Sequence, residues 1–443
     1  MAEAVASGDA TVAQRRWRAV KLTASHRLYG LGAVLLVALI VCARKFSGHG
    51  EAFPILPLLV AGAAYLLAIR ELLRNPKLPK RVIVIGLVFA ALWQVAFLTV
   101  PTGSDDDIRR YVWDGRMQRL GYNPYIVVPA DPAFAALHTS ETRALNNPEL
   151  PSLYPPGAEL FFRAVTAIHE TTFALRLAFA LCDVVIVFLM LDILRRTGQG
   201  AHWVLAFAWN PLLATGVVGS GHIDILGALL LVLSFAALIR RWRTVAAVSF
   251  ALAVAVKFLP IVLLPLYWRR IRIRDAALAA LVFVLLYVPF LDHERIPMGS
   301  LGTYIRGFRF NAPVFAMLVR VAAPQLLTGF AVFVGLAVAA WFRWKSETLS
   351  SEAFAWPMAA SLLCAPVVFP WYLLWLPPFA RSLATLPLMV WTVSILPTYI
   401  IWHLRMQGRP WTLPIWVVPV EYAAVALTAV LVLLRRGLRK NWS

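Results

Sequence analysis

Charged residues are scarce in this sequence. Only 14% of its 443 residues are Asp, Glu, Lys or Arg, whereas 60% are hydrophobic, and the mean hydropathy is +0.73. A soluble domain typically carries about 25% charged residues. The composition therefore excludes an ordinary soluble protein and predicts a chain that lies in a membrane.

Cysteine is nearly absent. The three cysteines, Cys42, Cys182 and Cys364, all lie inside apolar runs, where a free cysteine behaves as a small buried hydrophobic residue. Their number and spacing indicate neither a disulfide framework nor a metal site.

Acidic residues are few in comparison with basic ones. The chain has 22 Asp and Glu against 42 Lys and Arg, which gives a net charge of +20 and a pI near 10.6. Such an excess is typical of nucleic-acid-binding proteins. Here, however, the basic residues form short clusters between apolar runs, as they do in the cytoplasmic loops of membrane proteins. We therefore expect membrane lipids, and not nucleic acid, as partners.

Two further signals are missing. No A-x-A-type cleavage site follows the first apolar run, Leu28 to Cys42, so we expect an uncleaved first span in place of a signal peptide. The chain also has no tandem repeat and no pair of matched Gly/Pro-interrupted halves, which argues against an inverted-repeat transporter.

Long apolar runs dominate what is present. A spanning helix needs about 20 mostly apolar residues, and candidates occur at 28–45, 53–70, 82–100, 173–194, 202–218, 222–239, 244–267, 275–292, 325–342, 353–369, 384–402 and 415–434. The run 244–267 contains Lys257 and Pro260 and is either one span or two short pieces that meet in the membrane. Residues 370–380 suggest a broken or re-entrant helix. The prediction is an all-α polytopic membrane protein, a single domain over 1–443 with about 12–14 spanning or half-spanning helices.

The basic clusters predict the orientation. If all of them face the cytoplasm, both termini lie inside and the segments 101–172, 293–312 and 403–414 face outward. This arrangement requires that 244–267 crosses twice and that 370–380 also returns inward. We therefore expect a multi-pass protein of the cytoplasmic membrane whose functional site faces the periplasm or exterior.

The loop 101–172 is far longer than an ordinary connection of about 4–6 residues. It opens with an acidic triplet and a mixed segment that holds most of the candidate site residues: Asp105, Asp106, Asp107, Arg109, Arg110, Trp113, Asp114 and Arg116. If Asp106 to Arg116 is helical, Asp106, Arg110 and Trp113 share one face. A carboxylate here can act as a general base, an arginine can hold a phosphate and a tryptophan can stack on a sugar. The alternative is that the aspartates only cap a helix.

Farther along this loop lie NPY and LYPPGAEL. Their tyrosines, Tyr125 and Tyr154, are either ligand contacts or anchors at the membrane interface. Pro156 fits the first turn of an amphipathic helix on the membrane.

Several ionisable residues fall inside predicted spans, where a charge costs roughly 2.5–3.5 kcal/mol. Arg176 and Asp183 neutralise either each other or partners on adjacent helices. Lys257 suits an anionic lipid phosphate or an ion pair with Asp183 or Asp224. His222 and Asp224, in GSGHIDILG, suit hydrogen bonding to a sugar or phosphate better than a metal, because two ligands without a third are weak evidence for one.

Two other polar or aromatic segments are candidates. Arg306 and Arg309, in GTYIRGFRFNAP, suit either phosphate or glycan recognition or lipid headgroups. Trp371, Tyr372 and Trp375 either line a sugar or lipid groove or belong to an ordinary aromatic belt.

Four segments occur in a familiar order: SDDDIRRYVWDGRMQRLGYNPY, LYPPGAEL, WNPLLATGVVGSGHIDILG and KFLPIVLLPLYWRR. Together they resemble bacterial glycosyltransferases of the GT-C type, notably polyprenyl-phosphate-mannose-dependent mannosyltransferases. The resemblance implies inverting transfer of a hexose, mannose above all, from a polyprenyl-phosphate donor to a lipid-linked or glycan acceptor on the outer face of the cytoplasmic membrane.

The resemblance also implies a base early in the first large outer loop. The matching position is Asp105, Asp106 or Asp107, with Asp106 favoured. Here the acidic motif follows the third predicted span and not the first, which indicates two additional N-terminal helices or a different subfamily.

A lipid-phosphate leaving group needs no bridging metal, so we expect neither a metal nor a cofactor. The alternatives are a transporter or flippase for a lipid-linked sugar or anionic substrate, and a membrane scaffold.

Overall fold

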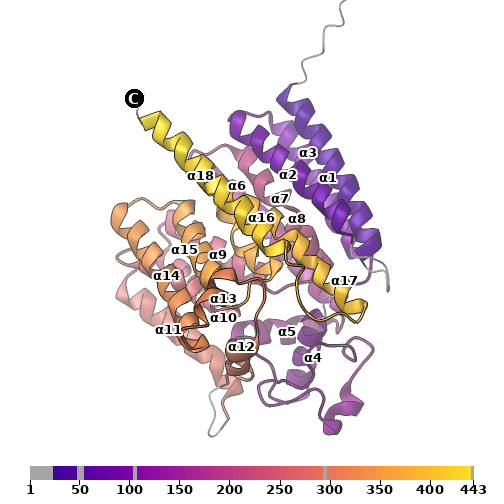
Figure 1. The fold of residues 1–443 in the computed structure, drawn as a ribbon. Helices are drawn as coiled ribbons and strands as arrows, with labels where there is room; N and C mark the ends of the chain where they lie inside the picture. Colours follow the sequence, from indigo (N-terminus) through magenta and orange to yellow (C-terminus); the bar gives the residue numbers. More distant parts are fainter. Residues whose placement is uncertain (1–22, 47–53, 103–106, 293–296, 441–443) are drawn as a thin grey trace, which may run out of the picture.

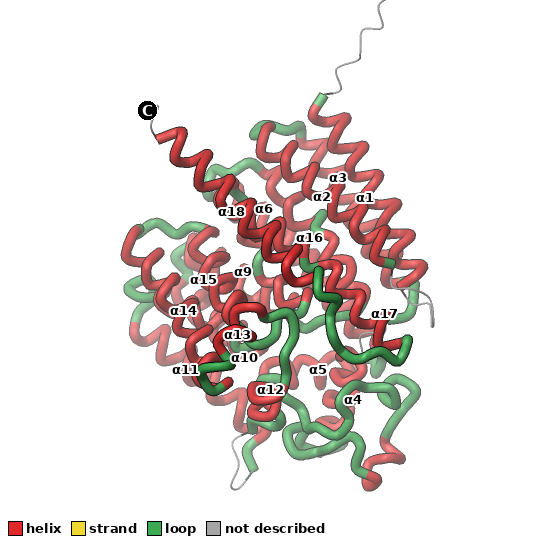
Figure 2. Tube along the Cα trace, in the orientation of Figure 1, coloured by secondary structure: helices red, strands yellow, loops and turns green. Residues whose placement is uncertain are grey.

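The computed structural model describes residues 23–46, 54–102, 107–292 and 297–440, which form helices joined by loops with no strand among them (Figures 1 and 2). Within these residues, eight helices are long and apolar enough to cross a membrane, and one further pair of bent pieces passes the same test together. The prediction of an all-α polytopic membrane protein is confirmed.

Three long helices open the chain and stand side by side (Figure 1): α1 (Ala24–Phe46), α2 (Ile55–Arg74) and α3 (Lys80–Leu98). Arg27 at the start of α1 pairs with Glu71 at the end of α2, with 2.8 Å between Nη2 and Oε2. Gly86 lets α3 pack closely on the next layer, because a Cβ there would lie 2.7 Å from Leu205 Cδ2.

The 101–172 loop carries α4 (Asp107–Arg119), the short η1 (Pro132–Leu137) and α5 (Pro156–Ile168). Pro156 occupies the first turn of α5, as its fixed φ favours. The helices α4 and α5 pack through Tyr111 and Phe162, whose rings stack at 4.3 Å, and through Gly115, where a Cβ would lie 2.6 Å from the Phe162 carbonyl oxygen. The helices predicted for this loop are therefore present.

The central part of the chain runs through α6 (Thr172–Arg196), η2 (Ala201–Trp203), α7 (Val204–Ala208), α8 (Pro211–Leu213), η3 (Ala214–Gly219), α9 (Asp224–Ile239), α10 (Arg243–Val256), η4 (Leu259–Tyr267), α11 (Ile273–Tyr287) and η5 (Val288–Phe290). The predicted span 202–218 is bent by 49° between its two halves. Asn210 stabilises the bend, because its side chain accepts from Leu212 N at 3.0 Å and donates to Thr392 Oγ1 at 2.8 Å.

The run 244–267 is broken at Lys257. There α10 ends in extended backbone, and the tight helix η4 follows. At the far end of η4, the Tyr267 hydroxyl bonds Ser234 Oγ at 2.6 Å, and the same Oγ donates to Ala246 O near the start of α10. The chain therefore travels out along α10 and back along η4, which confirms the two-piece interpretation.

The C-terminal part contains α12 (Leu301–Gly307), α13 (Pro313–Leu318), α14 (Pro324–Lys345), α15 (Ser351–Cys364), η6 (Pro370–Trp375), η7 (Pro377–Phe379), η8 (Leu383–Thr385), α16 (Leu386–Ser394), η9 (Leu396–Tyr399), α17 (Ile400–Met406) and α18 (Val417–Lys440). The predicted span 353–369 is shorter than expected, because α15 ends at Cys364 and the chain then forms an isolated bridge between Val367 and Phe310. Residues 370–379 form tight turns that bring Ser382 back to Glu352 at the start of α15, 2.6 Å apart.

Within the described residues, the basic clusters and the 101–172 loop lie at opposite ends of the molecule. Arg240 pairs with Asp192 near the end of α6, Thr244 bonds Asp275 at the start of α11, and Arg343 donates to Trp268 O. The helices α4, α5 and α12 gather at the other end (Figure 1). This separation is the one that the positive-inside interpretation requires.

Candidate active site

A cavity of about 1020 Å³ lies where the 101–172 loop meets the helices that follow it in the chain. Its wall combines α4, the segment 146–155, the start of α9, the end of α10, α12, and residues 362–375 and 402–411. Six of the predicted site residues line it: Asp107, Arg110, Tyr154, Asp224, Lys257 and Arg309.

The acidic triplet reaches this wall through Asp107, the first residue of α4. The amide of Asn146 donates to Oδ1 at 2.5 Å, and Oδ2 lies 3.8 Å from Nδ1 of His222. A helix N-terminus stabilises a carboxylate, and the side chain keeps 22% of its surface exposed. Asp105 and Asp106 lie outside the described residues, so Asp107 is the member of the triplet that the structure places.

His222 lies behind Asp107 and is fully buried. Gly221 turns the chain here with φ +77°, and a Cβ at that position would collide with Ile108. The imidazole stacks on Trp371 with ring centroids 3.8 Å apart, and Trp371 in turn stacks on Phe369 at 4.6 Å. His222 therefore joins the acidic residue to an aromatic wall.

Lys257 and Asp224 form a buried ion pair at the same cavity. The Lys257 Nζ lies 2.7 and 2.9 Å from the two carboxylate oxygens, and Trp375 Nε1 donates to Oδ1 of Asp224 at 2.8 Å. Gly227 on α9 makes room for the Trp375 indole, because a Cβ there would collide with the ring. The Asp224 side chain is 1% exposed and that of Lys257 is 22% exposed. Of the partners that the sequence left open for Lys257, Asp224 is the observed one, and the ammonium group still reaches the cavity.

Arg110 is a second cation on the wall, and the buried carboxyl group of Asp114 lies beside its guanidinium. Its guanidinium donates to Leu150 O, and Nε lies 3.3 Å from Oδ1 of Asp114. Burial raises the pKa of Asp114 to about 6, against the charge of Arg110, which lowers it. Burial and the neighbouring charge of Asp114 raise the pKa of Glu159 well above its usual range. Burial therefore favours the neutral form of Glu159, while the neighbouring Arg110 guanidinium favours the ionised form of Asp114.

Aromatic side chains form much of the remaining wall. Trp371, Tyr372 and Trp375 all line the cavity, as the groove interpretation predicts. The Tyr372 ring lies 3.8 Å from the Lys257 Nζ, and its hydroxyl bonds the hydroxyl of Tyr304 at 2.6 Å. Aromatic faces of this kind suit sugar rings and isoprenoid chains.

Five predicted site residues have partners within the 101–172 loop and do not line the cavity. Arg109 donates to Glu141 O at 3.1 Å, and Trp113 stacks on His138 at 4.1 Å. The Tyr125 hydroxyl donates to Tyr154 O at 2.6 Å. The remaining two are Asp114, described above, and Arg116.

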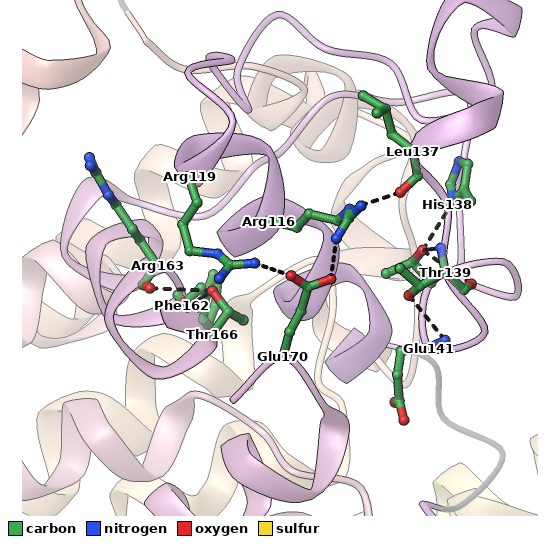
Figure 3. A network of polar contacts seen from close by, with 11 residues as sticks. Arg116, Arg119, Leu137, His138, Thr139, Glu141, Phe162, Arg163, Thr166 and Glu170 are labelled. Atoms are coloured by element: carbon green, nitrogen blue, oxygen red, sulfur yellow. Dashed lines mark hydrogen bonds and ion pairs between the residues drawn. The ribbon is translucent and has the colours of Figure 1, made fainter. Parts of the chain in front are cut away.

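Arg116 belongs to a network centred on Glu170, which also pairs with Arg119 (Figure 3). Its Nε donates to Leu137 O at 2.9 Å, so the network ties α4 to the end of η1. These contacts stabilise the loop, and a direct substrate contact for these residues stays a prediction.

The remaining predictions concern arginines and His222. Arg309 donates to carbonyl groups at the end of α12, among them Ile305 O at 3.1 Å, and lines the cavity. Arg306, on the same helix, and His222 are not among the lining residues. Arg176 donates to Val218 O and Val100 O, and Asp183 accepts from Gln94. Both therefore find partners on neighbouring segments and not in each other.

Sequence reasoning did not single out Asn146, Trp402, Arg405, Arg409 and Trp411, which also line the cavity. The sequence does contain a signal for Arg405 and Arg409, because both follow a long apolar run and lie in a segment predicted to face outward. Basic residues are less frequent on that side, so cations there invite a functional interpretation.

Within the described residues, no group of three or more His, Cys, Asp and Glu side chains has an arrangement that could hold a metal ion. Metal independence stays a prediction, because Asp105 and Asp106 lie outside this set.

Residues 19–271 match the MptA_B family model, described as alpha-(1->6)-mannopyranosyltransferase, N-terminal domain. No curated protein and no solved structure matches the chain. The matched region includes Asp107, Asp224 and Lys257 and covers more than half of the 443 residues. It supports an enzyme over a transporter or a scaffold. The chain therefore belongs to the alpha-(1->6)-mannopyranosyltransferase family and is a membrane-embedded mannosyltransferase of the GT-C type.

Proposed function

We propose that this protein transfers mannose, with inversion, from a polyprenyl-phosphate donor to a lipid-linked or glycan acceptor at the outer face of the cytoplasmic membrane. One observation carries the proposal: the acid Asp107 and the cation Lys257, 150 positions apart in the sequence, line a single cavity. An acid and a cation are the two groups that transfer from a lipid phosphate requires.

The donor phosphate would lie near Lys257 and Arg110, where positive charge stabilises the negative charge that develops on the leaving group. Lys257 is suited to this role because Asp224 fixes its ammonium group while part of the side chain still faces the cavity. The apolar and aromatic wall would accommodate the sugar and the first isoprene units of the lipid.

The base would be one of Asp105, Asp106 and Asp107. It takes the proton of the acceptor hydroxyl as that oxygen attacks the anomeric carbon. The bond between the anomeric carbon and the phosphate oxygen breaks, and polyprenyl phosphate leaves with the electron pair. Because the leaving group is already a stable lipid monophosphate, this reaction does not require a bridging metal.

The stereochemistry constrains the donor. The family description specifies an alpha-(1->6) product. A single displacement inverts the anomeric carbon, so an alpha product requires a donor in which mannose is beta-linked to the phosphate. We therefore propose a beta-linked polyprenyl-phosphate mannose as the substrate.

The test replaces the three aspartates separately by alanine. Purified protein in liposomes receives labelled polyprenyl-phosphate mannose and candidate acceptors, and transfer is measured. One of Asp105→Ala, Asp106→Ala and Asp107→Ala should lower kcat by about 10²–10⁴-fold, the range for loss of a general base, without lowering expression.

Asp131→Ala is the matched control. Asp131 belongs to the same loop but only caps η1, where its side chain accepts from Ala133 N at 2.9 Å. This variant should keep full activity. If all three variants of the triplet also keep full activity, the assignment of the base is wrong.

A further inference from the structure

A second hollow lies between two turns of the chain, and none of its lining residues has a role in the proposed transfer reaction. It has a volume of about 380 Å³ and is formed by the turn between α9 and α10 and the turn between η4 and α11. Its lining residues are Arg241, Arg243, Thr244, Arg272, Arg274 and Asp275. We call it the arginine hollow.

The arginine hollow is far from the cavity of the candidate active site. Helix α10 begins at the hollow with Arg243 and ends next to Lys257, and its 14 residues span about 21 Å. Helix α11 also begins at the hollow, and the segment that follows it reaches the 101–172 loop, where Phe290 O accepts from Asn123. The two sites therefore lie at opposite ends of the same helices.

The charges around the hollow are unbalanced. Four of the six lining residues are arginines, and Asp275 is the one carboxylate among them. That carboxylate already has other partners: Thr244 Oγ1 donates to Oδ1 at 2.6 Å and the backbone N–H of Arg272 donates to Oδ2 at 3.1 Å. Arg274 Nε lies 3.9 Å from Oδ1. The hollow therefore has a strong excess of positive charge. The hydrogen bond from Thr244 to Asp275 connects the starts of α10 and α11, which carry these arginines or follow them closely.

Exposed tryptophans place the hollow at the level of lipid headgroups. Trp242 and Trp268 flank the two turns and are 53% and 69% exposed. Tryptophan concentrates at the membrane–water interface, where an apolar ring and a polar N–H group are both accommodated. An anion at this level is most readily supplied by a phospholipid.

We propose that the arginine hollow binds the phosphate group of an anionic membrane lipid. Guanidinium groups bind phosphate oxygens in pairs of parallel hydrogen bonds, and the volume admits a headgroup phosphate between the two turns. The site selects anionic over zwitterionic lipids, because a choline or ethanolamine group would bring a positive charge toward four arginines. This binding is independent of the transfer reaction.

The experiment measures lipid binding to the full-length protein in neutral detergent. Native mass spectrometry and thermal unfolding are recorded during titration with short-chain phosphatidylglycerol, with phosphatidylcholine and, separately, with inorganic phosphate. Phosphatidylglycerol should bind saturably and raise the melting temperature, as expected for a ligand of the folded state. Phosphatidylcholine and inorganic phosphate should do neither over the same range.

Two variants connect the binding to the hollow. Arg243→Gln and Arg272→Gln should each weaken the apparent affinity for phosphatidylglycerol about fivefold, since one interfacial arginine contributes about 1 kcal/mol. Arg269→Gln, an exposed arginine at the same end that does not line the hollow, is the control and should bind normally. Mannose transfer without added lipid should be unchanged in all three variants.

Three outcomes would overturn the proposal. If Arg269→Gln weakened the binding of phosphatidylglycerol as much as Arg243→Gln and Arg272→Gln, the lipid would be attracted by the general positive charge of this end and not by a specific site. An uptake of phosphatidylglycerol that never saturates would mean the same. Binding of inorganic phosphate that depends equally on Arg243 and Arg272 would replace the lipid by a free anion.

Discussion

A charged residue in the cavity needs a partner that offsets the cost of its burial, and in the proposed reaction it also contacts the substrate. Lys257 shows this most clearly. Asp224 offsets the cost of burying its ammonium group, and Trp375 donates to the same carboxylate. A change at either member of the pair therefore affects folding as well as chemistry, and an experiment must separate the two.

Lys257→Ala should raise the KM for the donor about 10- to 100-fold, the range for loss of a charge-assisted contact with phosphate, and should change the KM for the acceptor much less. The comparison is Lys257→Met combined with Asp224→Asn, which removes both buried charges. This double variant should recover the melting temperature lost in Lys257→Ala but not the affinity for the donor. Equal changes in the two KM values would contradict a phosphate role for Lys257.

Glu159 offers a test of charge at the residue level that is independent of the substrate. It is fully buried, it accepts from Ser152 Oγ at 2.5 Å and from Gln118 Nε2 at 2.8 Å, and its pKa is raised by burial and by Asp114. A carboxyl group with a raised pKa in the fold stabilises the protein below its ordinary pKa, and this stabilisation is lost as the pH rises toward the folded-state value.

Glu159→Gln should therefore match the wild-type melting temperature near pH 5 and exceed it increasingly as the pH rises to 8, because glutamine stays neutral. Glu159→Ala should be less stable at every pH by about 2–4 kcal/mol, since it leaves a cavity and unsatisfied polar groups. Thermal unfolding in detergent across this pH range measures both. A glutamine variant that becomes relatively less stable as the pH rises would mean that Glu159 is ionised in the fold.

At the level of helices, α18 is tied to the cavity wall by a buried carboxylate. Glu421 accepts from Trp391 Nε1 at 2.7 Å and from Asn311 Nδ2 at 3.0 Å, and the neighbouring Tyr422 donates to Asn311 O. Asn311 has φ +49°, a conformation that asparagine tolerates better than most residues. It follows Phe310, which stacks on Phe369 at 4.5 Å and lines the cavity. The C-terminal helix thereby positions the aromatic wall.

Glu421→Ala should lower kcat several-fold, because the Asn311 turn and the stacked rings lose their support, and it should cost about 1–3 kcal/mol of stability from the unpaired donors. Glu421→Gln, which keeps an acceptor, should recover most of the kcat. Asp183→Asn is the control, since Asp183 is also buried in a spanning helix but accepts from Gln94 on α3. If Asp183→Asn lowers kcat as much as Glu421→Ala, the effect on the wall is not specific.

Local sequence signals predict where most helices lie, but they miss the early end of α15 at Cys364, and they do not predict the partners of the helices. Pro156 predicts the start of α5, because proline acts on its own backbone. The break after α10 falls in the run that contains Lys257 and Pro260. The choice of Asp224 over Asp183 for Lys257 could not be predicted, since both lie in apolar runs and only the packing of α9 against α10 decides.

The face of α4 was only partly predictable for the same reason. Asp106, Arg110 and Trp113 were expected on one face, but α4 packs on α5 and η1, so Trp113 lies against His138 while Asp107, Arg110 and Tyr111 line the cavity. The helical periodicity predicts which side chains lie on the same face of a helix. It does not predict which face the neighbouring loop will cover.

For the protein as a whole, the cavity joins two parts of the chain. The acidic residue, Asp224 and Lys257 come from the region 19–271 that matches the family, whereas Tyr304, Tyr372 and Arg405 come from the remainder. In the proposed mechanism, the chemistry of transfer therefore belongs to the first part. The second part supplies much of the aromatic wall and the additional arginines.

In the proposed mechanism, the acid at the start of α4 and Lys257 act on one lipid phosphate sugar in this cavity. The most direct measurement is a structure of the full-length protein with a non-transferable polyprenyl-phosphate mannose analogue. We expect the phosphate within hydrogen-bond distance of the Lys257 Nζ, about 3 Å, and the anomeric carbon directed toward residues 105–107. A phosphate bound outside the cavity, or one whose sugar is directed away from the acidic triplet, would contradict this mechanism.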